Sequence, residues 1–363
     1  MANLLDYMAW RDDLTLAQDA LNEIDGVILA RAAYFPFDKI GMSEKTRVSV
    51  AAAMAAFLLV PDIQGKVLFR EDYHLIKRLG DSPRFRKMEL FGYENIFEAE
   101  KETQFSAVTV ELGDGRYYVS FRGTDNTLVG WKENFNMSFE TPVPAQLLAV
   151  KYLERIAGSV KGRLILGGHS KGGNLAVYAG AFCAGAVQDR IDAVYNFDGP
   201  GFVQKVLDEP GYDRICGRVK TLVPQSSVVG MLLEHEEEYT IVHSTQSGLL
   251  QHDVYSWEAE REHFVRLETV TAGSYFVDAT VKDWIASLDN ARREAFVDAI
   301  YTVLKETNAA TLREMGEHWF SSAMAILRSL RGLDEPTRDM VKETLQALLR
   351  SAGGELSRTT LNK

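Results

Sequence analysis

The chain has 363 residues, of which 46% are hydrophobic and 25% charged, and its formal net charge is −11. This composition is typical of a soluble globular protein, and the length suffices for one large α/β domain with an appendage or for two domains. The acidic balance argues against a nucleic-acid partner, because phosphate binding needs a basic surface, and it weakens the case for docking on an anionic membrane.

Cysteine use and hydropathy bear on the compartment. Cys183 and Cys216 are the only cysteines, so the sequence implies no disulfide framework and fits a reducing environment. The N-terminus lacks the basic region of a secretory signal. The apolar, uncharged run 48–61 is too short to span a bilayer and is typical of a buried helix. We therefore expect a cytoplasmic protein without a transmembrane segment.

The first hundred residues are predicted to be largely helical. Asn22 and Asp25 can cap a helix whose apolar side chains recur at helical spacing over 24–32. After a break at a proline, a second helix is expected over 43–61. Residues 62–104 carry scattered aromatic side chains, and irregular structure with short helices is expected there.

The pattern then changes to that of β-structure. Residues 106–112 alternate between apolar and polar, a glycine-rich turn follows, and 116–121 are rich in aromatic and β-branched side chains, which predicts a β-hairpin. An amphipathic helix is expected over 144–157. It leads into an apolar run, 164–166, that has the character of a strand.

Three further strand-like runs follow, at 193–197, 219–223 and 239–243, with helical or turn segments between them. This alternation predicts an α/β fold with a mostly parallel sheet flanked by helices. We expect an α/β domain over 1–280, including the helical N-terminal segment, and a C-terminal helical extension or subdomain over 281–363. Three roles fit that extension: a lid, an interface for a homo-oligomer, or a cover for the sheet.

A Gly168-x-Ser170-x-Gly172 sequence joins the strand at 164–166 to an alanine-rich helix. In this strand-turn-helix context the pattern is that of a nucleophile elbow. Glycines beside the serine avoid collisions with the neighbouring backbone, and the N–H of Lys171 at the helix N-terminus stabilises negative charge. A plain glycine-rich turn is an alternative. A phosphate-binding loop is another, but it needs the order Gly-Lys-Ser or Gly-Lys-Thr.

A serine nucleophile needs a base, a carboxylate that orients the base, and donors for the oxyanion. In α/β hydrolases the chain order is serine, acid, histidine. The histidines downstream of Ser170 are His235, His243, His252, His263 and His318.

The base should lie in a loop after the last strand, which favours His252. His243, at the end of that strand, fits a partly buried, hydrogen-bonded ring. His235 stands among four glutamates, and a solvated acidic face is expected there. His169 belongs to the elbow and is expected to point elsewhere.

Asp198 is the candidate acid, because it follows the strand at 193–197 and precedes a Gly-Pro-Gly turn. Functional residues of open α/β sheets gather at the carboxyl ends of strands. The alternative is a turn residue, which an Asp before Gly usually is. After the next strand come Ser226 and Ser227, and no carboxylate appears before Glu234.

The oxyanion donors are expected to be the N–H of Lys171 and, from the loop after the strand at 116–121, the N–H and hydroxyl of Thr124. The alternative for that loop is a simple exit turn of the hairpin. This chemistry requires no metal and no organic cofactor. His252, Asp253 and His263 do not have the spacing of a compact metal site.

Over about residues 106–260 the chain resembles the class 3 (fungal-type) lipases of the α/β-hydrolase superfamily. The resemblance rests on Phe121-Arg122-Gly123-Thr124, Trp131-x-x-Asn134 and Gly168-His169-Ser170-Lys171-Gly172-Gly173. Over most of its length the chain also resembles a bacterial branch, the Mbeg-like proteins. That likeness rests on Asn22-Glu23-Ile24-Asp25, Asn196-Phe197-Asp198-Gly199-Pro200-Gly201-Phe202 and Gln251-His252-Asp253.

These resemblances imply an α/β-hydrolase fold, with Ser170 as nucleophile and Thr124 and Lys171 as oxyanion donors. The chain departs from the class 3 pattern at two places. Ser226 and Ser227 stand where those lipases carry their acid, which moves the acid role to Asp198. Lys171 replaces the usual leucine and is expected to place a cation at the elbow, which favours an anionic or polar substrate.

Together these features predict a serine hydrolase of the esterase or lipase kind, acting on a carboxylic ester of a lipid or another acyl substrate through Ser170, His252 and Asp198. The alternative is a catalytically inactive hydrolase-fold protein that serves as a binding or scaffold module. The absence of a carboxylate near Ser227 and the helical extension motivate that alternative.

Overall fold

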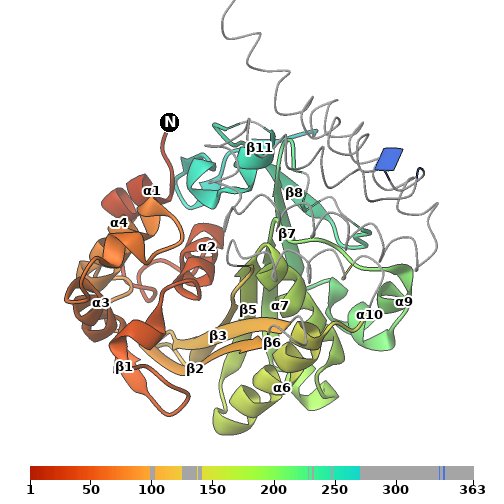
Figure 1. Cartoon of the computed structure of the whole chain (residues 1–363), viewed down its shortest axis with the longest axis horizontal. Coiled ribbons are helices and arrows are strands. Elements are labelled where there is room, and N and C mark those ends of the chain that lie inside the picture. Colours follow the sequence, from red (N-terminus) through yellow and green to blue (C-terminus); the bar gives the residue numbers. More distant parts are fainter. Residues whose placement is uncertain are drawn as a thin grey trace, which may run out of the picture.

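A mixed β-sheet forms the centre of the fold, with the strand order β1-β2-β3-β4-β5-β6-β7-β8-β11 in the described part of the chain (Figure 1). The structure is a computed structural model, and it describes residues 1–98, 103–124, 137, 141–227, 229–230, 233–246, 248–269, 335, 338 and 339. The predicted boundary at residue 280 and the extension over 281–363 lie, but for three positions, outside these residues.

The sheet has an antiparallel part and a parallel part. Strands β1 to β4 pair antiparallel, β4 to β8 pair parallel, and β11 pairs antiparallel with β8. A separate small hairpin consists of β9 and β10. The bounds are β1 (Arg47–Ser49), β2 (Glu89–Glu98), β3 (Thr103–Glu111), β4 (Arg116–Phe121), β5 (Arg163–His169), β6 (Ile191–Phe197), β7 (Val219–Pro224), β8 (Tyr239–Val242), β9 (Ala259–Glu260), β10 (His263–Phe264) and β11 (Arg266–Leu267).

Helices cover both faces of this sheet. Figure 1 shows α1 to α4 on one side and α6, α7 and α10 on the other. The helices are α1 (Leu4–Arg11), α2 (Glu23–Ala32), α3 (Val50–Leu58), α4 (Arg70–Asp81), α6 (Pro144–Ser159), α7 (Lys171–Phe182), α8 (Gly185–Gln188), α9 (Gln204–Leu207) and α10 (Pro210–Cys216). Short 3₁₀ turns are η1 (Phe37–Ile40), η2 (Ile63–Gly65), η4 (Gly248–His252) and η5 (Val254–Ser256).

The alternation of side chains along the strands divides the core in two. On β5, Ile165 packs with the N-terminal helices, whereas Leu164 and Leu166 pack with α6 and α7. Successive side chains of a strand point to opposite faces, so both faces of a central strand must be apolar. The predicted hairpin and the three predicted strands after the elbow are present, and the expected α/β-hydrolase fold with a helical N-terminal segment is confirmed.

Two predictions for the N-terminal region were wrong. The helix expected over 43–61 begins only at Val50, where the Ser49 hydroxyl caps it, and β1 precedes it. The region expected to be irregular over 62–104 contains the 12-residue helix α4 and the long strand β2. A register shift between Phe91 and Glu94 breaks the period-2 pattern of β2, which hid the strand. A further strand, β11, follows β8, which was expected to be the last.

Two charged residues of α2 lie in the interior. The guanidinium of Arg31 is fully buried and binds Asp72 of α4, with Nη2 at 2.8 Å from Oδ1 and 2.6 Å from Oδ2. The same carboxylate accepts a hydrogen bond of 2.8 Å from the hydroxyl of Tyr255. The second residue, Asp25, binds Arg84. Buried charges of this kind require their partners, because water is excluded.

Replacing Asp72 by asparagine should lower the free energy of unfolding by about 3–5 kcal/mol, because it leaves the Arg31 guanidinium buried without an anion. Urea denaturation measures this change. The control is Asp189→Asn, since Asp189 pairs with Arg214 at the surface, and there the change should stay within about 0.5 kcal/mol. Equal effects of the two substitutions would contradict the prediction.

A further buried carboxylate lies in the connection between β7 and β8. Glu237 accepts hydrogen bonds from His235, Thr221 and Tyr212. The side chain of His235 is only 6% exposed, so the expectation of a solvated acidic face was wrong for this residue. Burial alone would raise the pKa of Glu237, but these hydrogen bonds and the charge of His235 lower it to about 2.

A depressed carboxyl pKa stabilises the fold above the pKa of the unfolded chain, and the gain is lost as the pH falls through the folded pKa. The contribution of Glu237 should therefore disappear between about pH 4.5 and pH 2. Glu237→Gln should destabilise the protein at pH 7 by up to about 3 kcal/mol and have little further effect at pH 2. Denaturation midpoints from pH 7 to 2 test this, with the exposed Glu236→Gln as control. A penalty that does not change with pH would refute it.

Candidate functional site

The elbow connects the end of β5 to the start of α7. Ser170 has φ +59° and ψ −133°, a conformation that side chains seldom adopt and that marks functional turns. The two glycines allow close contact of backbones: a Cβ on Gly168 would lie 2.2 Å from the carbonyl carbon of Gly172. A Cβ on Gly172 would lie 2.2 Å from the carbonyl oxygen of Phe121. The serine is therefore held where β4, β5 and α7 meet.

Asp198 follows β6, the next strand of the sheet. Its backbone has φ +51°, its amide donates to the carbonyl oxygen of Leu222 at 2.8 Å, and its side chain is 1% exposed. Oδ2 of this carboxylate lies 2.7 Å from Nδ1 of His252, which is at the end of η4. The structure thus brings Asp198 and His252 into hydrogen-bond contact.

The second oxygen of Asp198 also has a partner. Oδ1 accepts a hydrogen bond from the hydroxyl of Ser227, which lies in the turn after β7. The amide of Gly230 donates to that hydroxyl at 2.9 Å. Ser227 stands where the class 3 lipases carry their acid. Its hydroxyl contacts the carboxylate of Asp198, which the neighbouring strand β6 supplies.

His169 was expected to point elsewhere, but its ring lies 4.5 Å from that of His252, centre to centre. Nε2 of His169 is 2.8 Å from the carbonyl oxygen of His252. A carbonyl only accepts, so Nε2 carries a proton. Burial, followed by the charges of His252 and Arg31, lowers the pKa of His169 well below its ordinary value, so the ring is neutral. The ring of a neutral His169 supports the backbone that carries His252.

Tyr34 joins the elbow to the loop after β4. Its hydroxyl accepts a hydrogen bond of 3.0 Å from the amide of Gly123 and donates to the carbonyl oxygen of His169 at 3.1 Å. A Cβ on Gly123 would lie 3.2 Å from Cβ of Ser170. The loop that contains Thr124 therefore runs directly beside the serine. The sequence held no signal for Tyr34, because it lies 135 residues before His169.

The two predicted oxyanion donors are Lys171, at the start of α7, and Thr124, in the loop after β4. Lys171 is the first residue of α7, so its amide lies at the N-terminus of this helix. Its side chain is fully buried, and Nζ donates to the carbonyl oxygen of Gln104 at 2.8 Å. Lys171 was expected to place a cation at the elbow that favours an anionic or polar substrate, but its ammonium group is buried and bound to a backbone carbonyl. Thr124 is half-buried at the edge of the described residues, and Trp131 and Asn134 lie outside them.

Two other candidate histidines are engaged elsewhere, and His318 lies outside the described residues. Nδ1 of His243 lies 2.7 Å from Oε2 of Glu258, and His235 contacts Glu237. In the part of the chain that the structure describes, no group of three or more His, Cys, Asp or Glu side chains is arranged to hold a metal ion. None of the helices in the described segments combines the length and the hydropathy that a membrane crossing requires.

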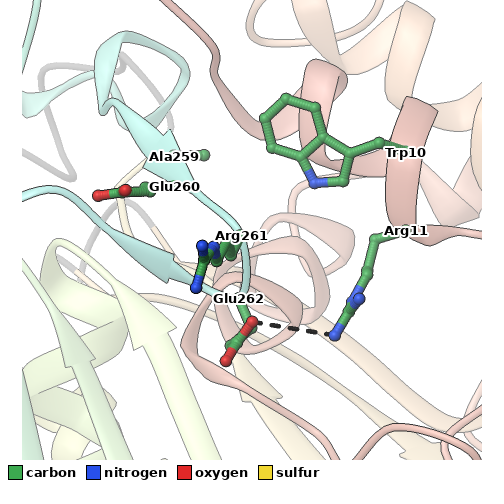
Figure 2. Close-up of a pocket in the computed structure, with 6 residues that line it drawn as sticks. All are labelled: Trp10, Arg11, Ala259, Glu260, Arg261 and Glu262. Carbon is green, nitrogen blue, oxygen red and sulfur yellow. Dashed lines mark ion pairs between the residues drawn. The ribbon is translucent and has the colours of Figure 1, made fainter.

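A surface pocket of about 530 Å³ lies between α1 and the β9–β10 hairpin (Figure 2). None of the candidate site residues contributes to it, and an ion pair of 3.9 Å joins Arg11 to Glu262 at its border. The pocket is thus separate from the site around Ser170. Its lining residues are Trp10, Arg11, Ala259, Glu260, Arg261 and Glu262.

Among solved structures, the chain is similar to the Lip2 lipase from Yarrowia lipolytica, with 10% identity, 50% of this chain and 71% of the lipase covered, and a TM-score of 0.32. It is similar to a Rhizomucor miehei lipase in its propeptide complex, with 12% identity, 60% and 86% covered, and a TM-score of 0.35. A further fungal lipase has 12% identity, 68% and 84% covered, and a TM-score of 0.38.

No curated protein matches the chain. The family model described as Mbeg1-like matches residues 79–302, which is more than half of the sequence and includes the elbow, Asp198 and His252. The protein therefore belongs to the Mbeg1-like family.

Proposed function

We propose that this protein is a serine hydrolase that cleaves carboxylic esters of a lipid or another acyl substrate. The observation that carries the proposal is the 2.7 Å contact between Nδ1 of His252 and Oδ2 of Asp198. Ser170, with its positive φ, directly follows His169, whose ring contacts that of His252. A carboxylate only accepts, so Nδ1 of His252 carries the proton and Nε2 has the lone pair of a general base. The side chain of His252 is 27% exposed, so substrate and water can reach it.

In the proposed reaction, Oγ of Ser170 attacks the ester carbonyl carbon while Nε2 of His252 takes the hydroxyl proton. Asp198 stabilises the imidazolium that forms. The tetrahedral intermediate collapses, and His252 returns the proton to the leaving alkoxide. Water then attacks the acyl-enzyme with His252 as base, and the carboxylic acid is released. Ser170 regains its proton from His252, so the cycle closes without a cofactor.

Oxyanion stabilisation is assigned to the backbone amide of Lys171 and to Thr124. The amide of Lys171 lies at the N-terminus of α7, where negative charge is favoured. Thr124 supports the proposal by position, because Tyr34 holds the adjacent Gly123 against the elbow. Donors fixed in this way need no reorganisation as the charge develops.

A cytoplasmic location is proposed because the sequence has only two cysteines, Cys183 and Cys216, and both are free thiols in the structure. Association through the C-terminal helices stays a prediction. An inactive scaffold would not require the His252–Asp198 contact or the strained backbone of Ser170. The next experiment distinguishes this alternative from the hydrolase.

Ser170→Ala should abolish labelling by a fluorophosphonate probe and lower kcat for an ester by roughly 10⁶-fold, because it removes the nucleophile. Labelling and the hydrolysis of p-nitrophenyl esters of short and long acyl chains measure this. Ser159→Ala is the matched control, since Ser159 lies at the end of α6 and its hydroxyl binds Ile156. Wild-type protein that neither labels nor cleaves any ester of the series would favour the scaffold.

Asp198→Asn should lower kcat on the order of 10⁴-fold while preserving the shape of the site. An amide that turns its NH₂ group towards Nδ1 of His252 would favour the wrong tautomer and leave Nε2 protonated. Steady-state kinetics with the best ester of the series measure the loss. Asp208→Asn, at the exposed end of α9, is the control. A variant of Asp198 that keeps more than about a tenth of the activity would exclude this residue as the acid.

A further inference from the structure

The carboxylate of Asp198 is held through both of its oxygens. Oδ2 faces Nδ1 of His252 at 2.7 Å, and Oδ1 faces the hydroxyl of Ser227. Asp198 and Ser227 are 1% and 3% exposed, so water does not compete for either group. A carboxylate with one partner can rotate about its Cβ–Cγ bond. A second fixed donor defines the plane in which Oδ2 meets the imidazole.

The direction of the Ser227 hydrogen bond follows from its neighbours. The amide of Gly230 can only donate, so at 2.9 Å the oxygen of Ser227 accepts from it. The Asp198 carboxylate can only accept, so the single hydroxyl proton of Ser227 points to Oδ1. Ser227 is therefore a donor of fixed direction, and its bond to the anion is of the stronger, charge-assisted kind.

The turn that contains Gly230 is itself anchored. A Cβ at position 230 would lie 2.3 Å from Oδ1 of Asp198, so only glycine lets this amide approach so closely. The carbonyl oxygen of Gly230 accepts a 2.7 Å hydrogen bond from Nε2 of His235, whose Nδ1 lies 2.9 Å from Glu237. The ring of His235 thus links the turn at Gly230 to the buried Glu237.

We infer that Ser227 is a positioning residue of the site: it holds the Asp198 carboxylate in the orientation that presents Oδ2 to His252. Ser227 acts through Asp198 and does not touch the substrate. The inference rests on the proposed hydrolase function and deepens it. Two neighbouring strands contribute to this arrangement: the carboxylate follows β6, and the hydroxyl that orients it lies in the turn after β7.

The test replaces Ser227 by alanine and by cysteine. Cysteine keeps the volume of the side chain and is a poor donor, so it separates the lost hydrogen bond from a lost contact. Both variants should lower kcat by roughly 10- to 100-fold, with KM nearly unchanged. Ser226→Ala is the matched control in the same turn, where the backbone amide keeps its bond to Gln251. It should retain the wild-type kcat.

A pH profile distinguishes positioning from a loss of stability. Without the Ser227 donor, Asp198 becomes a stronger acceptor for His252, so the acidic limb of kcat/KM should move to higher pH in both variants. The other titratable ring against His252 is that of His169, and burial keeps it neutral. A merely structural role would lower the denaturation midpoint and leave that limb in place.

The possible outcomes separate the two proposals. Wild-type protein that does not label at Ser170 overturns the hydrolase function, and the inference about Ser227 falls with it. Wild-type protein that labels, with Ala and Cys variants that keep the wild-type kcat and pH profile, overturns the inference alone. An equal loss in Ser226→Ala overturns it too, because the turn and not the hydroxyl would then be responsible. Folding of each variant is checked by its denaturation midpoint.

Discussion

Arg31 carries a charge that has no access to water. The residues that contact this charge also hold the elbow and the loop that contains His252. Its guanidinium binds Asp72, which also accepts the hydroxyl of Tyr255, three residues after His252. The carbon of the guanidinium lies 4.0 Å from the centre of the Tyr34 ring. Cation–π contact with a desolvated guanidinium favours that ring position. The hydroxyl of Tyr34 in turn joins the elbow to the loop after β4.

The N-terminal helices therefore do more than cover one face of the sheet. They hold the loop that carries His252 through Asp72 and Tyr255, and they hold the elbow through Tyr34. The opposite layer, with α6 and α7, packs on the other face of the sheet, and α7 begins directly after the serine. A parallel sheet gathers the ends of β5, β6 and β7 at one edge, and the two layers fix the loops there.

The parts of the fold with local signals could be predicted from the sequence. The elbow, the hairpin and the parallel strands have periodicities and turn residues within short windows. Strand β2 was missed because a bulge at Gly92 breaks its alternation. The acidic surroundings of His235 in the sequence suggested solvent, yet Tyr212 and Thr221 from two other elements bury its partner Glu237. Such contacts leave no trace in the residues next to the histidine.

The same limit applies to the candidate site. Placement after strands was enough to single out Asp198 and His252, whose roles in a triad remain a proposal. The orientation of His169 was misjudged, because its contact with His252 joins residues 83 positions apart and no local pattern encodes it. Ser227 was interpreted as the sign of a missing carboxylate. In the folded protein its hydroxyl donates to the carboxylate of Asp198, which comes from the neighbouring strand.

The bond from Tyr255 to Asp72 joins residues that are 183 positions apart, and the amide of Phe264 meets Glu23 across 241 positions. Contacts of such long range form late, after the local elements. On the ribosome, the serine turn emerges well before the segment that anchors the histidine loop, and domains fold as their chain becomes available. A growing chain would then display Ser170 before the loop that carries His252 is fixed in place. The proposed reaction would become possible only once Tyr255 and Phe264 have reached the N-terminal helices.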